Sequence, residues 1–196
     1  MSTIQPPFWI SKYSIEMNRI LLLLLFVQIG LGSSAQSYLP VEKGTAIAFG
    51  IKNFGFLVEG SFTGVKGNIQ FNPLKLGNAR FEMTIDAASI NTDNKKRDRH
   101  LRDKDYFYTE KYPVIYLTST NISTSNHDGY YVFEGEVYIR GISKQISFEF
   151  SAKPSISGYL FHGEFQLNRA DFRVGGNSLT LSDQVHISLN VLTIKK

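Results

Sequence analysis

The chain of 196 residues contains no cysteine. This absence excludes a disulfide scaffold, a cysteine nucleophile, a thiolate zinc site and an iron–sulfur cluster. An excess of one charge sign is also missing, because 21 Lys and Arg residues are nearly balanced by 17 Asp and Glu residues. The net charge of +4 allows contact with a membrane surface, but it is far from the composition of a protein that binds nucleic acid. We therefore expect no nucleic-acid partner.

Long apolar runs are absent apart from residues 20–31. Lys12 and Arg19 precede this run and small residues follow it as far as Ala35, which is the order found in a secretory signal peptide. The run is shorter than the roughly twenty residues that cross a bilayer, so a membrane anchor is the less favoured alternative. We expect residues 1–35 to be a signal peptide, with Met17 as an alternative natural start. Residues 36–196 are then one domain in the periplasm or outside the cell.

Aromatic residues are abundant, with 15 Phe, 10 Tyr and 1 Trp. Four of these 26 lie within residues 1–35, so 22 Phe and Tyr residues remain in the expected mature domain. Burial of so many large side chains offsets the conformational entropy lost on folding, and a disordered chain is therefore excluded.

Alternation of apolar and polar residues dominates the chain from residue 45 onward, and alternation with period two indicates β-strands. Residues with turn propensity, such as Asn-Pro, Asp-Gly and Gly-Gly, separate the alternating segments. A single short helix is predicted over residues 93–105. The predicted strands cover residues 45–51, 58–62, 65–71, 79–87, 114–122, 131–139, 146–150, 161–167 and 185–191.

One short helix cannot cover a sheet of eight or nine strands, so the apolar faces of these strands must be buried against each other. The sequence therefore predicts an all-β fold, either an antiparallel barrel or a sandwich. The interior of an eight-stranded barrel is either just filled by side chains or holds one small ligand. The aromatic residues accordingly have two explanations, a packed core or the wall of an apolar cavity.

Motifs for catalysis and metal binding are missing from the sequence. The four histidines include no HExxH pair, and no GxSxG, GxGxxG or P-loop motif occurs. We therefore expect a protein that is not an enzyme and has no catalytic residues, no metal site and no resident cofactor.

Two features are candidates for binding an anionic group. The segment of residues 95–105 contains six basic and three acidic residues, which suits either a solvated helix or a mouth that accepts an anionic head group. Arg169 continues the inward-facing positions of residues 161–167, and a buried guanidinium needs a partner. That partner is either Asp171 or Asp183 in a structural ion pair, or the phosphate of a ligand.

Several short motifs occur in a fixed order over about residues 44–193: FGIKNFG at 49–55, EGSF at 59–62, residues 67–73, IDAASINT at 85–92, RDRHLR at 97–102, DYF at 105–107, KYP at 111–113, GEVYIRGISK at 135–144 and NRADF at 168–172. On these residues the sequence resembles the YceI-like family of exported, lipocalin-like polyisoprenoid-binding proteins. It departs from the usual family pattern at Tyr106, Tyr108, Leu117 and Arg173.

The resemblance implies an eight-stranded antiparallel, lipocalin-like β-barrel with one short helix. Its cavity would hold an isoprenoid lipid of the polyprenyl phosphate or isoprenoid quinone type, for transport or storage. Edge strands and exposed Tyr residues allow a homodimer without requiring one, so we expect a monomer or homodimer. The alternative is a filled barrel that acts as an interaction or stress-response module without a lipid. As lipid-lining residues we expect Phe133, Val137, Phe148, Phe150, Phe165 and Leu167. As head-group residues we expect Arg169, Arg102 and His100.

Overall fold

The computed structural model describes residues 36–196, so the predicted signal peptide lies outside the described residues. These residues form one antiparallel sheet of ten strands. The strands are β1 (Ser37–Pro40), β2 (Ala46–Asn53), β3 (Phe56–Phe62), β4 (Lys66–Gln70), β5 (Arg80–Asp86), β6 (Val114–Thr124), β7 (Tyr130–Ile139), β8 (Ile142–Pro154), β9 (Tyr159–Asn168) and β10 (Leu181–Lys195). All nine predicted strands are present, and the four-residue strand β1 is additional because it is too short to show alternation.

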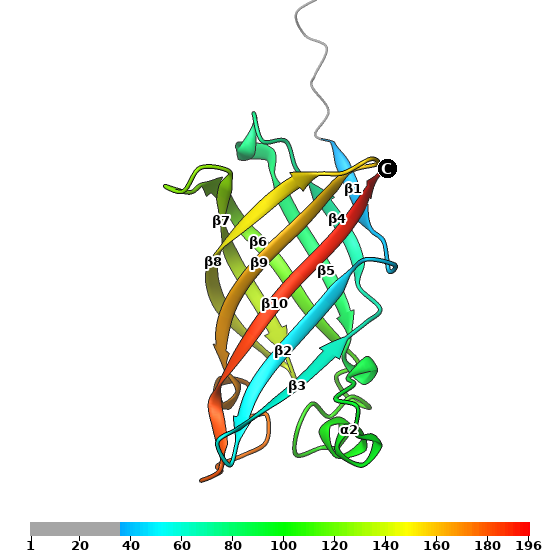
Figure 1. The fold of residues 1–196 in the computed structure, drawn as a ribbon, viewed down its shortest axis with the longest axis vertical. Coiled ribbons are helices and arrows are strands. Elements are labelled where there is room, and N and C mark those ends of the chain that lie inside the picture. Colours follow the sequence, from blue (N-terminus) through cyan, green and yellow to red (C-terminus); the bar gives the residue numbers. More distant parts are fainter. Residues whose placement is uncertain (1–35) are drawn as a thin grey trace, which may run out of the picture. The chain divides into compact units, whose positions relative to one another are not determined.

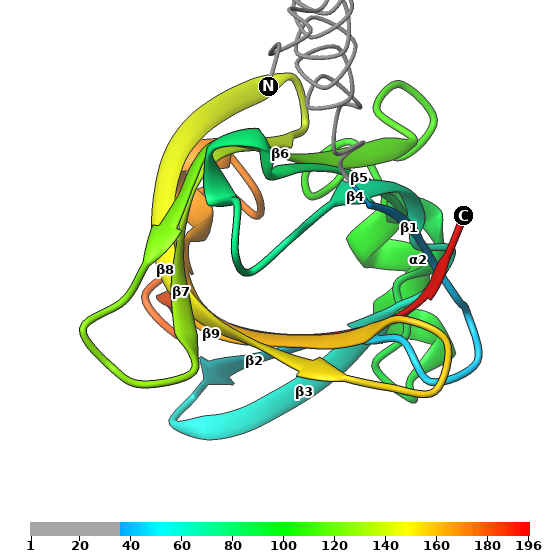
Figure 2. The same ribbon diagram turned by 90° about the horizontal axis from the view of Figure 1, so that it is seen from above.

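Strand β1 closes the sheet into a barrel. It pairs with β4 on one side and with the end of β10 on the other, so β1, β4, β5, β6, β7, β8, β9 and β10 form a ring of eight strands. Figure 2 shows this ring from above. Closure pairs the edges that an open sheet would leave free. The predicted eight-stranded antiparallel barrel is therefore confirmed, and the sandwich is excluded.

The hairpin of β2 and β3 extends the wall of the barrel at one end. The first part of β10 pairs with β2, and β2 pairs with β3. Strand β3 reaches the β5 side only through a single bridge between Ser61 and Asn91. The ladder is therefore interrupted at this end, and Figure 1 shows helix α2 (Lys95–Arg102) there, at the end opposite the C-terminus. We call this the helical end of the barrel.

Helix α2 is shorter than the predicted segment 93–105. The side chain of Asn94 accepts hydrogen bonds from the backbone N–H groups of Lys96 and Arg97, which caps the helix at its start. Asp103 has extended backbone angles and ends the helix. Three short 3₁₀ turns complete the fold: η2 (Leu76–Asn78), η3 (Ala87–Ser89) and η4 (Arg169–Phe172).

Aromatic side chains fill the half of the barrel away from α2, which we call the packed end. Phe71 is 1% exposed, and its ring meets those of Tyr131, Tyr159 and Phe161 edge to face at centroid distances of 5.1, 5.4 and 5.3 Å. This geometry places the positive edge of one ring against the negative face of another. A packed core therefore explains many of the aromatic residues, although not all of them.

Two inward-facing glycines mark where the packed end stops. A Cβ atom on Gly135 would lie 2.8 Å from the ring of Phe133, and one on Gly163 would lie 2.9 Å from the ring of Phe148. A real Cβ atom cannot approach an aromatic carbon so closely, so only glycine leaves room for these rings. The next inward-facing residues on these two strands are Val137 on β7 and Phe165 on β9. They lie beyond the glycines, toward the helical end of the barrel.

Candidate functional site

The helical end of the barrel encloses a cavity of about 380 Å³. Its wall consists mostly of apolar side chains from the inner faces of β2, β3, β5, β6, β7, β9 and β10, together with residues from α2 and from the segments 106–107 and 172–181. The volume lies within the range of about 300–1,000 Å³ that is usual for small-molecule sites. The barrel is thus packed at one end and hollow at the other.

Three stacked phenylalanines form the floor of the cavity. Phe165 lines it, and its ring stacks on that of Phe148 at a centroid distance of 4.5 Å. Phe148 in turn stacks on Phe133 at 4.8 Å. Behind Phe165, the other two rings border a separate void of only about 20 Å³. The stack therefore divides the open half of the interior from the packed half.

The mouth of the cavity is bordered by three segments: the turn between β2 and β3, helix α2, and the loop before β10. They contribute Phe54, Leu101 and Thr180, respectively. The turn and the loop are tied together, because the backbone N–H of Phe54 donates a hydrogen bond to the carbonyl oxygen of Thr180 at 2.9 Å. Polar groups in the lining are concentrated at this mouth, while the deeper wall is apolar.

Arg97 is a cation in the cavity wall that the sequence analysis did not single out. Its Nε donates to Thr92 Oγ1 and its Nη2 to the Thr92 carbonyl oxygen, both at 2.7 Å. The Thr92 hydroxyl donates to Asp98 Oδ1 at 2.6 Å, and the Asp98 side chain is buried. Among the described residues, Nη1 of Arg97 has no hydrogen-bond partner. The guanidinium is therefore held in place with one nitrogen available to a ligand.

Helix geometry explains why Arg97 lies at the cavity and Arg102 does not. Leu101 lines the cavity, and Arg97 precedes it by four residues, so both lie on one face of α2. At about 100° per residue, Arg102 is turned roughly 140° from Arg97. Arg102 instead donates to the carbonyl oxygens of Ala88 and Ile90 at 2.7 and 2.9 Å and ties α2 to the preceding segment. Arg102 therefore does not meet the expectation of a head-group residue.

His100 lies at the rim of the mouth. It is among the residues that line the cavity, its side chain is 60% exposed, and its ring contacts that of Tyr106 at a centroid distance of 4.7 Å. Of the three expected head-group residues, it is the one placed where a ligand could reach it from solvent.

Arg169 has all of its donors occupied. Nε donates to the carbonyl oxygen of Ser182, Nη1 to those of Val174 and Gly176, and Nη2 to Leu181 O and to Asp183 Oδ1, at 2.7–3.3 Å. A guanidinium has five N–H donors, and these five acceptors use every one. The side chain is buried, although it borders the cavity. Of the two roles considered for it, the structure shows the ion pair with Asp183 and leaves no donor for a ligand.

The expected lining residues divide into two groups. Val137, Phe165 and Leu167 line the cavity of about 380 Å³. Phe133, Phe148 and Phe150 lie in the packed half and border only the small void. Alternation of apolar and polar residues shows which face of a strand points inward, and all six residues do lie on inward faces. Alternation carries no information about depth along the barrel. The spacing Phe-x-Gly-x-Val at 133–137 and Phe-x-Gly-x-Phe at 161–165 is the sequence signal for this boundary.

Strands β2 and β3 supply part of the lining that the sequence analysis missed, including Phe49, Ile51, Val58 and Phe62. Within residues 36–196, no three His, Asp or Glu side chains are grouped closely enough to hold a metal ion. No helix in the same range has the length and hydrophobicity needed to span a membrane.

Comparison with known proteins gives consistent matches. The family model for the YceI-like domain matches residues 38–192. A UPF0312 protein from Photorhabdus laumondii is 35% identical over 101 residues, which is 51% of this chain and 52% of that protein. A UPF0312 protein from Shewanella denitrificans is 24% identical over 83% of this chain and 90% of its own length.

Solved structures share the fold. BcnA from Burkholderia cenocepacia superimposes with a TM-score of 0.73 at 22% identity, covering 78% of this chain and 98% of that one. The Campylobacter jejuni YceI protein gives 0.62 at 26% identity, covering 71% and 85%. A polyisoprenoid binding domain from Saccharophagus degradans gives 0.66 at 16% identity, covering 82% and 98%.

Proposed function

The chain belongs to the YceI-like domain family, and on this premise we propose that it is an exported protein that holds a polyisoprenoid chain in its barrel cavity. The observation that carries the proposal is the apolar cavity of about 380 Å³ that opens at the helical end. The ligand would be a lipid of the polyprenyl phosphate or isoprenoid quinone type, and the role would be transport or storage rather than catalysis. The similar fold of a protein described as a polyisoprenoid binding domain supports the same class of ligand.

The chemistry of the wall suits a hydrocarbon chain. Transfer of a hydrocarbon from water gains about 0.8 kcal/mol for each CH₂ group and needs no directional contacts. A wall of Phe, Ile, Leu and Val side chains provides such an environment. The cavity counts against a barrel that is filled throughout, which was the basis of the alternative interaction module.

The polar end of the ligand would lie at the mouth, beside Arg97. One guanidinium nitrogen of Arg97 is available there, and hydrogen bonds between a guanidinium and a phosphate are among the stronger polar contacts in proteins. A polyprenyl phosphate would use this group, whereas an uncharged quinone ring would not. Arg97 therefore offers a means to distinguish the two classes of lipid.

Export to the periplasm or the medium is supported by the order of charged, apolar and small residues within residues 1–35. The absence of cysteine is compatible with either location, because the barrel does not need disulfides to close.

The experiment is to purify the protein from its own host in buffer without detergent, and then to identify bound lipid by native mass spectrometry and solvent extraction. Val137→Trp should fill the cavity and lower the amount of bound chain, because Val137 lines it. Val132→Trp is the matched control on the outward face of the same strand. If the parent protein carries no lipid and binds no added polyprenyl chain, or if both variants bind as the parent does, the proposal is wrong.

A further inference from the structure

Large apolar side chains are exposed around the mouth of the cavity. Phe54 in the turn between β2 and β3 is 71% exposed, and Phe56 and Leu57 at the start of β3 are 77% and 61% exposed. Leu179 in the adjoining loop is fully exposed. The hydrogen bond from Phe54 to Thr180 holds the turn and the loop side by side. We call these four residues the apolar rim. Phe54 also lines the cavity, so the rim and the interior form one continuous apolar surface.

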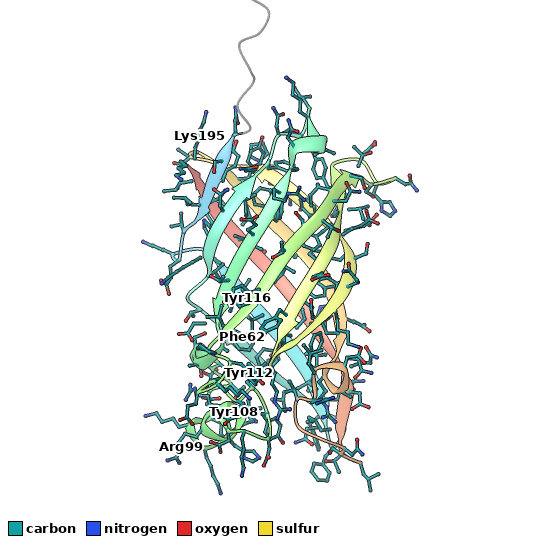
Figure 3. All side chains as sticks on the ribbon, turned by 180° about the vertical axis from the view of Figure 1, so that it is seen from behind. Phe62, Arg99, Tyr108, Tyr112, Tyr116 and Lys195 are labelled. Carbon is teal, nitrogen blue, oxygen red and sulfur yellow. The ribbon has the colours of Figure 1, made fainter. Side chains whose placement is uncertain are left out.

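Basic side chains lie at the same end of the barrel. Lys95, Lys96 and Arg99 on α2 are exposed, as is Lys52 on β2. Within α2 itself the one acidic residue, Asp98, is buried against Thr92, while the exposed acidic residues Asp93 and Asp103 flank the helix. Figure 3 places Arg99 at the end of the molecule opposite Lys195.

We propose that the helical end docks on an anionic phospholipid bilayer, with the apolar rim inserted into the interface and the basic residues of α2 facing the lipid phosphates. Apolar side chains beside Lys and Arg are the combination that binds peripheral proteins to such surfaces. A bilayer is the occupant that this charge favours, because each Lys or Arg near an anionic leaflet contributes to binding.

The position of the cavity explains how docking on a bilayer would serve lipid binding. An isoprenoid chain that leaves the bilayer under the rim enters the barrel without crossing water, so the hydrophobic cost of exposing it is avoided. The inference deepens the proposed function and rests on it for this purpose. Docking itself is measurable whether or not the cavity is occupied.

The test uses residues 36–196, which form the ten-stranded sheet and its hydrophobic core, so that the apolar segment 20–31 does not contribute. The probes are sedimenting vesicles of phosphatidylcholine alone and of phosphatidylcholine mixed with phosphatidylglycerol. The rim variant is Phe56→Ser/Leu179→Ser, neither of which lines the cavity. The matched control is Leu74→Ser/Ile156→Ser, two exposed residues in the β4–β5 and β8–β9 connections, which lie at the end opposite α2 (Figure 1).

We expect the parent and the control to bind the mixed vesicles. The rim variant should bind them at least roughly tenfold more weakly, since two inserted side chains are lost. Charge reversal by Lys95→Glu/Lys96→Glu should weaken binding to mixed vesicles and leave binding to phosphatidylcholine unchanged, whereas Lys195→Glu/Lys196→Glu should change neither. Docking is refuted if the parent binds neither vesicle, or if the rim variant binds as the parent does. A rim variant that loses self-association instead, as measured by light scattering, would identify the rim as an interface between copies of the chain.

The failures of the two proposals are distinguishable. A polyprenyl chain supplied from detergent solution should load the rim variant as well as the parent, because its cavity is intact. If the parent docks on vesicles but no chain loads from detergent, the proposed lipid-binding function is refuted and the docking proposal is supported. If a chain loads but the parent does not dock, the reverse holds.

Discussion

Phe148→Ala should join the cavity to the packed half of the barrel. Phe148 is the middle ring of the stack that forms the floor, between Phe133 and Phe165. Removal of this ring leaves a gap between Phe133 and Phe165, in the stack that separates the cavity of about 380 Å³ from the void of about 20 Å³ beneath it. The variant should therefore accept an apolar chain that reaches deeper into the barrel than the parent protein allows.

The cost in stability follows from burial. A phenylalanine buries about 200 Å², and Phe148 is only 9% exposed, so about 180 Å² leaves water on folding, worth about 4.5 kcal/mol at ~25 cal/mol per Å². Alanine retains a small part of this, while the loss of two ring contacts adds to the cost. We expect the free energy of unfolding to fall by about 3–5 kcal/mol, the usual range for Phe→Ala in a core.

The control is Phe150→Ala, two residues further along β8 toward the packed end. Phe150 is also buried, at 3% exposed, and its ring packs on those of Phe81 and Tyr131 and not on that of Phe165. Both variants should lose similar stability in urea unfolding of the lipid-free protein. Only Phe148→Ala should shift the bound chains in native mass spectrometry toward longer species, and part of its lost stability should return on loading.

The reasoning would be refuted by either of two results. A loss of less than about 1 kcal/mol on Phe148→Ala would show that the stack is not a packed floor. Equal chain-length distributions for Phe148→Ala and Phe150→Ala would show that the floor does not limit the depth of the ligand.

Three further predictions concern single side chains. Arg169→Met should lower the free energy of unfolding by about 3–5 kcal/mol in a denaturant titration, because five acceptors lose a buried charged partner. An unchanged unfolding midpoint would contradict a structural role for Arg169. Arg97→Gln should weaken binding of a polyprenyl phosphate roughly tenfold or more in a competition assay, with binding of an uncharged isoprenoid quinone unaffected; equal loss for both would contradict a phosphate contact. Hydrogen bonds from Ser125 and His127 lower the pKa of the Glu149 carboxyl. The ionised form of Glu149 therefore stabilises the fold fully at pH values above the pKa of a glutamate in the unfolded chain, and this stabilisation is lost as the pH falls through the lower pKa of the folded state. An NMR titration should find that lowered pKa, and Glu149→Gln should remove this part of the acid sensitivity.

The elements of the fold were largely predictable from local patterns. Alternation identified nine of the ten strands, because successive Cβ atoms in a strand point to opposite faces and a half-buried strand must therefore alternate. Strand β1 was not predicted, because its four residues are too few to show alternation. Its pairing with β4 and β10 nevertheless closes the barrel.

The candidate site was predictable only in part, and the arginines show why. The buried position of Arg169 followed from strand parity, but the five carbonyl and carboxylate acceptors around it come from residues 174–183, and nothing in the parity of β9 indicates where that loop returns. Arg97 lay within a charged segment from which Arg102 and His100 were chosen as head-group residues instead. Its place at the cavity depends on which face of α2 turns toward the barrel.

The amino-acid sequence is sufficient to establish an all-β fold with inward-facing aromatic residues, because period and burial are properties of each strand alone. The division of that interior into a packed half and a cavity arises only when strands meet in register. On β9, Phe161 packs against Phe71 while Phe165 lines the cavity, although both face inward on the same strand. The difference between them is depth along the barrel axis, which is set by the side chains that neighbouring and opposite strands bring to the same level.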